Sequence, residues 1–199
     1  MSNIEIDSKM RNYCVDVETL GVESTTVILS AAIVYFDVEK NPSYQDLLDN
    51  ALFVKFDSKD QVKRLARTVD IETLEWWQNQ HEYAKSVSLE PSVNDVKAEV
   101  GIEMLHNYMN KIPNARGLTM WTRGSLDQMA IDSLCKKVDM QLLTGYNVYR
   151  DVRTAVDCFT GSKNGYCNVD YPGFERAAVI KHHPVHDCAL DAMMLMYGK

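Results

Sequence analysis

The sequence has few of the residues that mark disulfide frameworks, linkers and disordered tails. Its 199 residues include only 5 cysteines, 5 prolines and 9 glycines. The cysteines are odd in number, widely spaced and never arranged as C-x-x-C, so we expect free thiols, with neither a disulfide framework nor a zinc site. No repeat, linker or low-complexity tract interrupts the chain. This length predicts one domain over residues 1–199.

Long hydrophobic runs and an excess of positive charge are also missing. The longest apolar stretch, residues 26–36, is shorter than the ~20 residues of a membrane span. The N-terminus lacks the apolar core of a secretory signal, so we expect a cytoplasmic protein with no membrane partner. The net charge of −7 argues against a protein that coats long nucleic acids by neutralising their phosphates.

The hydrophobic pattern predicts an α/β fold. The expected strands are Arg11–Asp16, Thr25–Phe36, Ala51–Phe56, Gly117–Gly124 and a short one within residues 146–152. Helices are expected between and after them, including Ser92–Met109, in which Val93 and Val100 share an apolar stripe. The order β-β-β-α-β-α-β-α, with extra helices before the fourth strand, is typical of the ribonuclease-H-like fold. We therefore expect a mixed five-stranded sheet with helices on both faces.

Acidic residues recur where these elements end. Asp16 and Glu18 are two positions apart in a strand, so their side chains share one face and are expected to aim just beyond the strand's end. Asp127 follows the fourth strand, and Asp191 lies in the final helix. Carboxylate oxygens are the ligands that Mg²⁺ and Mn²⁺ prefer, and a cation offsets the repulsion between the acids.

Three segments, in order, carry a family resemblance: "DVETLG", "WTRGSLD" and "HDCALDA". They resemble the three motifs of DEDDh-type 3′–5′ exonucleases. "RTVDIETLEWWQNQ" and "YRDVRTAVDCF" resemble the small branch that includes exonuclease A of T-even bacteriophages. The resemblance spans about Tyr13 to Met196. It implies hydrolysis from the 3′ end of single-stranded nucleic acid, with DNA as the expected substrate and RNA left open.

The resemblance also implies roles for individual residues. Two divalent cations, Mg²⁺ or Mn²⁺, are expected, the first held by Asp16, Glu18 and Asp191. Asp16 would bridge to the second, which Asp127 helps to hold. His186 would be the general base. The 3′-terminal nucleotide would meet Thr19 and Leu20, and related enzymes are often dimers, which leaves a homodimer open. Arg123, close to the Asp127 turn, is a candidate phosphate contact.

A second H-x4-D match competes with His186 and Asp191. It is formed by His182 and Asp187 in "KHHPVHD". We prefer Asp191 because it lies within an apolar helical run, whereas an acid at a helix start, such as Asp187, suits the helix dipole. His182 is then expected to be an exposed loop residue.

Other readings of the chain are open. Trp76 and Trp77 are expected to pack between helices or at a dimer interface rather than to stack on bases. A binding module that has lost activity would usually lack an acid or the histidine, and all five positions are filled here. A ribonuclease-H-type endonuclease would share the acids but would not need the H-x4-D arrangement.

Overall fold

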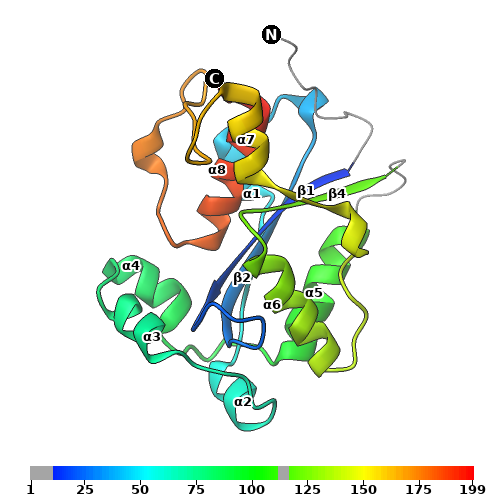
Figure 1. The fold of residues 1–199 in the computed structure, drawn as a ribbon, viewed down its shortest axis with the longest axis vertical. Coiled ribbons are helices and arrows are strands. Elements are labelled where there is room, and N and C mark those ends of the chain that lie inside the picture. The colour runs from blue at the N-terminus through cyan, green and yellow to red at the C-terminus, as the bar shows by residue number, and fades with distance from the viewer. Residues whose placement is uncertain (1–10, 112–116) are drawn as a thin grey trace.

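A computed structural model describes residues 11–111 and 117–199 as a five-stranded sheet with helices on both faces (Figure 1). The strands are β1 (Arg11–Thr19), β2 (Ile28–Phe36), β3 (Leu52–Lys55), β4 (Leu118–Thr122) and β5 (Tyr149–Asp151). Their order is β3-β2-β1-β4-β5. The β1, β2 and β3 strands form an antiparallel meander, whereas β4 and β5 run parallel to β1. The mixed sheet predicted from the sequence is confirmed.

The first strand is longer than predicted. Its pairing with β2 continues through Asp16↔Ala32 to Glu18↔Ser30, and the register shifts only between Glu18 and Thr19. Asp16 and Glu18 therefore project from within a paired strand, not from beyond its end. A rigid, paired backbone fixes the direction of both side chains.

One face of the sheet is covered by α5 (Ala98–Asn110) and α6 (Leu126–Lys137), which pack on Tyr13, Val15 and Val17 of β1. The predicted start of α5 is wrong. Residues before α5 pair with the edge of the sheet instead: the Val96 amide donates a hydrogen bond to the Lys55 carbonyl at 2.9 Å. The predicted apolar stripe shifts with the helix: Val93 is fully exposed, and the buried residues are Ala98, Gly101, Ile102, Leu105 and Met109.

The other face is covered by α1 (Tyr44–Asp49), α7 (Val152–Thr160) and α8 (Pro184–Tyr197). Cys14 of β1 and the apolar side of α8 share one hydrophobic cluster there. Side chains alternate along a strand, so Cys14, Asp16 and Glu18 all face α8. The sheet thus brings the two acids of β1 to the last helix of the chain.

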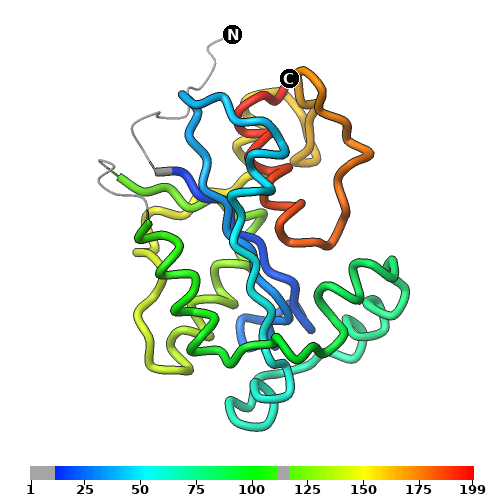
Figure 2. Tube along the Cα trace, turned by 180° about the vertical axis from the view of Figure 1, so that it is seen from behind, coloured from blue at the N-terminus to red at the C-terminus, as the bar shows by residue number. Residues whose placement is uncertain are grey.

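Short helices between β3 and α5 form a separate lobe. They are α2 (Ser58–Lys63), α3 (Ile71–Gln78), α4 (Glu82–Ala84) and η2 (Lys85–Leu89). In both views the α3–α4 segment lies next to the loop that precedes α8 (Figures 1 and 2). Trp77 of α3 is fully buried and belongs to one hydrophobic cluster with Leu20 and Leu29. The packing role predicted for Trp77 is therefore met within the chain.

The remaining short elements are η1 (Val38–Lys40), η3 (Tyr146–Val148) and η4 (Arg176–Ala178). Among the residues described, no helix has the length and apolar character needed to cross a membrane.

Candidate functional site

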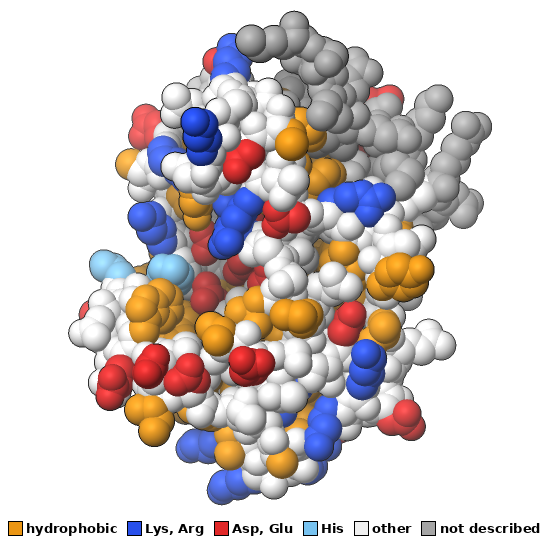
Figure 3. All heavy atoms as spheres, in the orientation of Figure 1, with side chains coloured by type: hydrophobic (Ala, Val, Ile, Leu, Met, Phe, Trp, Pro, Cys, Tyr) orange, Lys and Arg blue, Asp and Glu red, His pale blue; other side chains and the backbone are white. Residues whose placement is uncertain are grey.

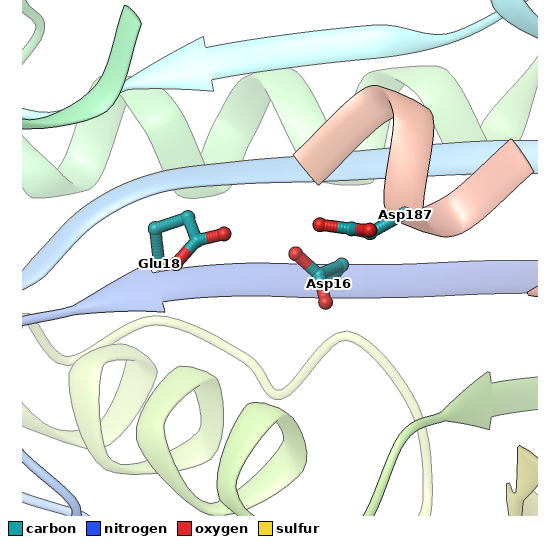
Figure 4. Close-up of side chains that lie close together, drawn as sticks. All are labelled: Asp16, Glu18 and Asp187. Atoms are coloured by element: carbon teal, nitrogen blue, oxygen red, sulfur yellow. The ribbon is translucent and has the colours of Figure 1, made fainter. Parts of the chain in front are cut away.

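Three carboxylates meet between β1 and α8. Asp16 and Glu18 project from β1, and Asp187 projects from the first turn of α8 toward them (Figure 4). One oxygen from each residue lies within 4.8 Å of the others. They line a cavity of about 1050 Å³. Figure 3 shows acidic side chains at the bottom of a hollow, with histidine, lysine and arginine side chains around its rim.

Two further acids lie near these three, and Asp191 also lines the cavity. Asp127, at the start of α6, accepts a hydrogen bond on Oδ1 from the Val17 amide at 3.2 Å. Asp191 lies one turn after Asp187 on α8, and its Oδ1 accepts from Nε of Arg123 at 3.0 Å and also from Nη2. The acid of α8 that meets Asp16 and Glu18 is thus Asp187, whereas the Asp191 carboxylate is paired with Arg123.

Burial and mutual repulsion make this cluster costly in its ionised form. Burial, then the Asp187 and Asp127 charges, raise the pKa of Glu18 to about 8. The pKa of Asp187 rises to about 7, mainly by burial and next by the charge of Asp191. Asp127 also has a pKa raised to about 7 by burial, an effect that the hydrogen bond from Val17 opposes. For Asp16 the pKa is raised well above its usual value, first by burial and then by Asp127.

The donor set fits a hard divalent cation. Asp16 Oδ2 is buried and has no hydrogen-bond partner among the residues described. A buried carboxylate oxygen without a donor is expensive unless a cation is bound to it. Asp16, Glu18 and Asp187 together offer the oxygen ligands that Mg²⁺ and Mn²⁺ select.

His182 is the histidine nearest the carboxylates. Its Nδ1 lies 4.0 Å from Oε1 of Glu18, and it lines the cavity. The backbone amide of His182 donates to Oδ2 of Asp187 at 3.0 Å, which ties this loop to α8. Burial lowers the pKa of His182, so its imidazole is neutral near pH 7. It is only 37% exposed and is not the free loop residue expected from the sequence.

His186 lies elsewhere. Its Nδ1 is hydrogen-bonded to the Tyr44 hydroxyl at 2.8 Å, and it is not among the residues that line the carboxylate cavity. The physical reason is the start of α8: Pro184 occupies its first turn, so His186 is already helical and faces α1. His182 precedes the helix with φ +60°. The sequence signal for this arrangement is the second H-x4-D match, His182 to Asp187.

Comparison with known proteins identifies the family. The family model of the 3′-5′ exoribonuclease Rv2179c-like domain matches residues 11–197. The chain belongs to this family. It is a 3′–5′ exonuclease on a ribonuclease-H-like fold, and the resemblance to DEDDh exonucleases is confirmed.

Individual relatives agree with this assignment. The exodeoxyribonuclease of Enterobacteria phage T4 is 26% identical over 213 residues, covering 95% of this chain and 89% of the phage protein. The nuclease domain of 3′hExo, a DEDDh family member solved with rAMP, has a TM-score of 0.61 at 9% identity and covers 93% of this chain and 90% of its own. Cell-death related nuclease 4 has a TM-score of 0.55 at 14% identity and covers 95% of this chain and 65% of its own. At these identities, the solved structures show a shared fold.

Other residues expected at the exonuclease site take different positions. Thr19 lines the carboxylate cavity, and its carbonyl accepts a hydrogen bond from Trp77 Nε1 at 2.9 Å. Leu20 is buried in the cluster around Trp77 and is not among the cavity-lining residues. Trp76 is 42% exposed, lines the cavity and contacts the His182 ring edge-to-face at 4.8 Å between centroids. The sequence did not connect Trp76 with a histidine more than 100 positions later, because only the α3–α4 lobe brings them together.

The metal-free protein is expected to lose stability as pH rises. The pKa values of Glu18, Asp127 and Asp187 are about 7–8 when folded and ~4 when unfolded, so the folded state binds more protons between these values. The stabilisation is fully present below pH ~4 and is lost as pH rises through ~8. A decrease of about 2 kcal/mol in the free energy of unfolding lowers Tm by about 4–8 °C in a chain of this size.

Thermal unfolding in EDTA from pH 5 to 8, repeated with excess Mg²⁺, measures this effect. Mg²⁺ should remove most of the decline, because bound cations favour the ionised carboxylates. A metal-free Tm that rises steadily over this range would contradict the prediction.

Arg123 is expected to stabilise the fold through Asp191. The pair is largely enclosed, with side-chain exposures of 13% and 7%. Arg123→Gln leaves Asp191 buried beside other acids, which costs about 3 kcal/mol. Urea unfolding at pH 7.5 measures the loss, and Arg123→Gln/Asp191→Asn should recover part of it. The exposed Arg150 is the matched control, and a loss in Arg150→Gln as large as in Arg123→Gln would refute the effect of the pair.

Proposed function

We propose that this exonuclease removes nucleotides from the 3′ end of single-stranded DNA with two bound divalent cations, Mg²⁺ or Mn²⁺, and with His182 as the general base. The observation that carries the proposal is the meeting of Asp16, Glu18 and Asp187 beside His182 in one cavity. No other group of three metal-binding side chains occurs within residues 11–111 and 117–199.

The acids would hold the cations. Asp16, Glu18 and Asp187 would provide the first set of oxygen ligands, and Asp127 would help to hold a second cation next to Asp16. When bound, the two cations supply electrostatic stabilisation to the attacking and leaving oxygens. Asp191 would act indirectly, since it holds Arg123 at the wall of the cavity.

His182 would move the proton. Its Nδ1 lies 4.0 Å from Oε1 of Glu18, so the imidazole stands beside the carboxylates that would hold the cations. The imidazole would accept a proton from the attacking water as the new P–O bond forms. The P–O3′ bond then breaks, a nucleoside 5′-monophosphate departs, and the shortened strand's O3′ takes a proton from solvent. The lowered pKa of His182 keeps the base unprotonated near neutral pH.

DNA is proposed as the substrate because the phage T4 relative, similar over 95% of this chain, is an exodeoxyribonuclease. The family description, exoribonuclease, supports RNA as the second candidate. Both sugars offer the same phosphodiester to the carboxylates, so the chemistry of the site suits either strand.

Digestion of matched single strands separates these candidates. Thymidylate and uridylate strands of equal length, labelled at the 5′ end, are incubated with Mg²⁺ and resolved on a gel. The proposal expects a ladder that shortens from the 3′ end, faster for DNA than for RNA. Faster loss of the RNA strand would reverse the substrate assignment. Internal cuts would indicate an endonuclease, and an intact strand would indicate a binding module.

A further inference from the structure

A second cavity adjoins the carboxylate cavity. It has a volume of about 720 Å³ and lies beside the end of α7, the loop that follows and η4. Tyr166 and Arg176 line both cavities. These two side chains therefore form a shared boundary, and a ligand that fills the first cavity can extend past them into the second.

The boundary carries a guanidinium without a carboxylate partner. The guanidinium carbons of Arg123 and Arg176 lie 4.3 Å and 5.4 Å from the centroid of the Tyr166 ring. Arg123 is paired with Asp191. Arg176 is exposed and forms no salt bridge in the part of the chain that the structure describes; besides the Tyr166 ring, its guanidinium contacts the sulfur of Met194, with Nη1 at 3.9 Å. Its donors are available to an anion.

Arg153 extends this positive surface. It is exposed, lines the carboxylate cavity and forms no salt bridge with any described residue. Its stem packs against Gly165, whose φ is +71° and where an added Cβ would lie 2.6 Å from Arg153 Cγ. This close approach holds the following residue, Tyr166, beside the arginines. In a chain with a net charge of −7, exposed arginines gathered here favour a polyanionic ligand.

Another part of the carboxylate cavity's lining differs in charge. It is formed by α3, with Glu72, Thr73 and Trp76, and by Asp70 at the start of that helix. Acidic and aromatic side chains there do not suit a phosphate backbone, whereas the arginine side does. A strand whose 3′ end reaches the carboxylates therefore has one favourable direction in which to continue.

We propose that the second cavity binds the nucleotides on the 5′ side of the scissile bond, and that Arg176 contacts a phosphate of that segment at the boundary. Arg176 is then a substrate-positioning residue that recognises strand length. The proposal needs the exonuclease activity of the family but not His182 as the base. A substrate with only the scissile phosphate cannot make this contact.

The test compares two unlabelled substrates: two thymidines joined by a single phosphodiester with no terminal phosphate, and a ten-nucleotide thymidylate strand. Products are measured by chromatography, and uridine equivalents replace both substrates if RNA is preferred. Arg176→Gln should lower kcat/KM about tenfold for the long strand, as expected for a lost charged contact, and leave the dinucleotide within about twofold. Arg176→Lys should recover most of the loss. The matched control is Lys63→Gln, on α2 and outside both cavities.

A binding measurement gives a readout independent of turnover. In an Asp16→Asn background, the slope of log Kd against log salt for the long strand should decrease by about 0.7 when Arg176 is replaced by Gln. Equal losses on both substrates would overturn the proposal, because Arg176 would then act at the carboxylates or the scissile phosphate. No loss on either would overturn it as well. Failure of every variant, with wild type also inactive, would instead contradict the exonuclease assignment.

Discussion

Asp16→Asn is expected to abolish hydrolysis while the protein remains folded. Asp16 belongs to the carboxylate cluster. Its Oδ2 forms no hydrogen bond with any described residue, so a cation can bind there without displacing a partner. Asn keeps the shape of the side chain but removes the charge that holds the cation. Losing several kcal/mol of stabilisation at the reacting oxygens lowers the rate by at least about 10³. Steady-state degradation of a single strand in Mg²⁺ measures the loss.

The same substitution should stabilise the metal-free protein. The substitution removes a charge whose burial, and next its repulsion by neighbouring acids, raise the pKa of Asp16. Tm in EDTA at pH 8 should therefore rise in Asp16→Asn. Asp139→Asn is the matched control, since Asp139 is exposed and has φ +57°, a conformation that Asn tolerates. Near-wild-type activity in Asp16→Asn would remove Asp16 from the site.

The fold could be predicted from the sequence because each strand carries its own signal. The apolar run of β2 has no exposed position and pairs with both neighbours, so its pattern is continuous and unambiguous. The start of α5 could not be predicted in the same way. Val93 and Val100 have helical spacing with the residues that follow, but Val96 pairs with the edge of the sheet before the helix begins. A tertiary contact decided that boundary, and the local pattern does not contain it.

In the candidate site, too, some features follow from the local sequence pattern and others depend on tertiary contacts. Asp16 and Glu18 share a face of one strand, which strand periodicity alone predicts. The choice between Asp187 and Asp191 depends on three-dimensional information. The two acids lie one turn apart on α8, but Asp187 meets Asp16 and Glu18 whereas Asp191 pairs with Arg123. The helix-dipole argument assigned Asp187 to a capping role. It did not account for the close approach of Asp187 to Asp16 and Glu18.

The sharpest remaining test separates the two histidines. His182→Asn should lower kcat by about 10²–10⁴, the usual effect of losing a general base. Asn suits the φ of +60° at this position, so the backbone is retained. KM should change little, because the base acts in the transition state. Single-turnover and steady-state rates on the same strand measure both quantities.

His186→Asn is the matched variant, with an expected loss of stability instead of activity. It removes the hydrogen bond between Nδ1 and the Tyr44 hydroxyl, which costs about 1 kcal/mol. Its kcat should stay within about threefold of wild type, since His186 does not line the carboxylate cavity. The opposite result, an inactive His186→Asn and an active His182→Asn, would return the base to His186 and the third metal ligand to Asp191. Both variants replace a histidine with an asparagine. A difference in kcat between them therefore reflects where each histidine lies relative to the reaction, and not the kind of substitution made.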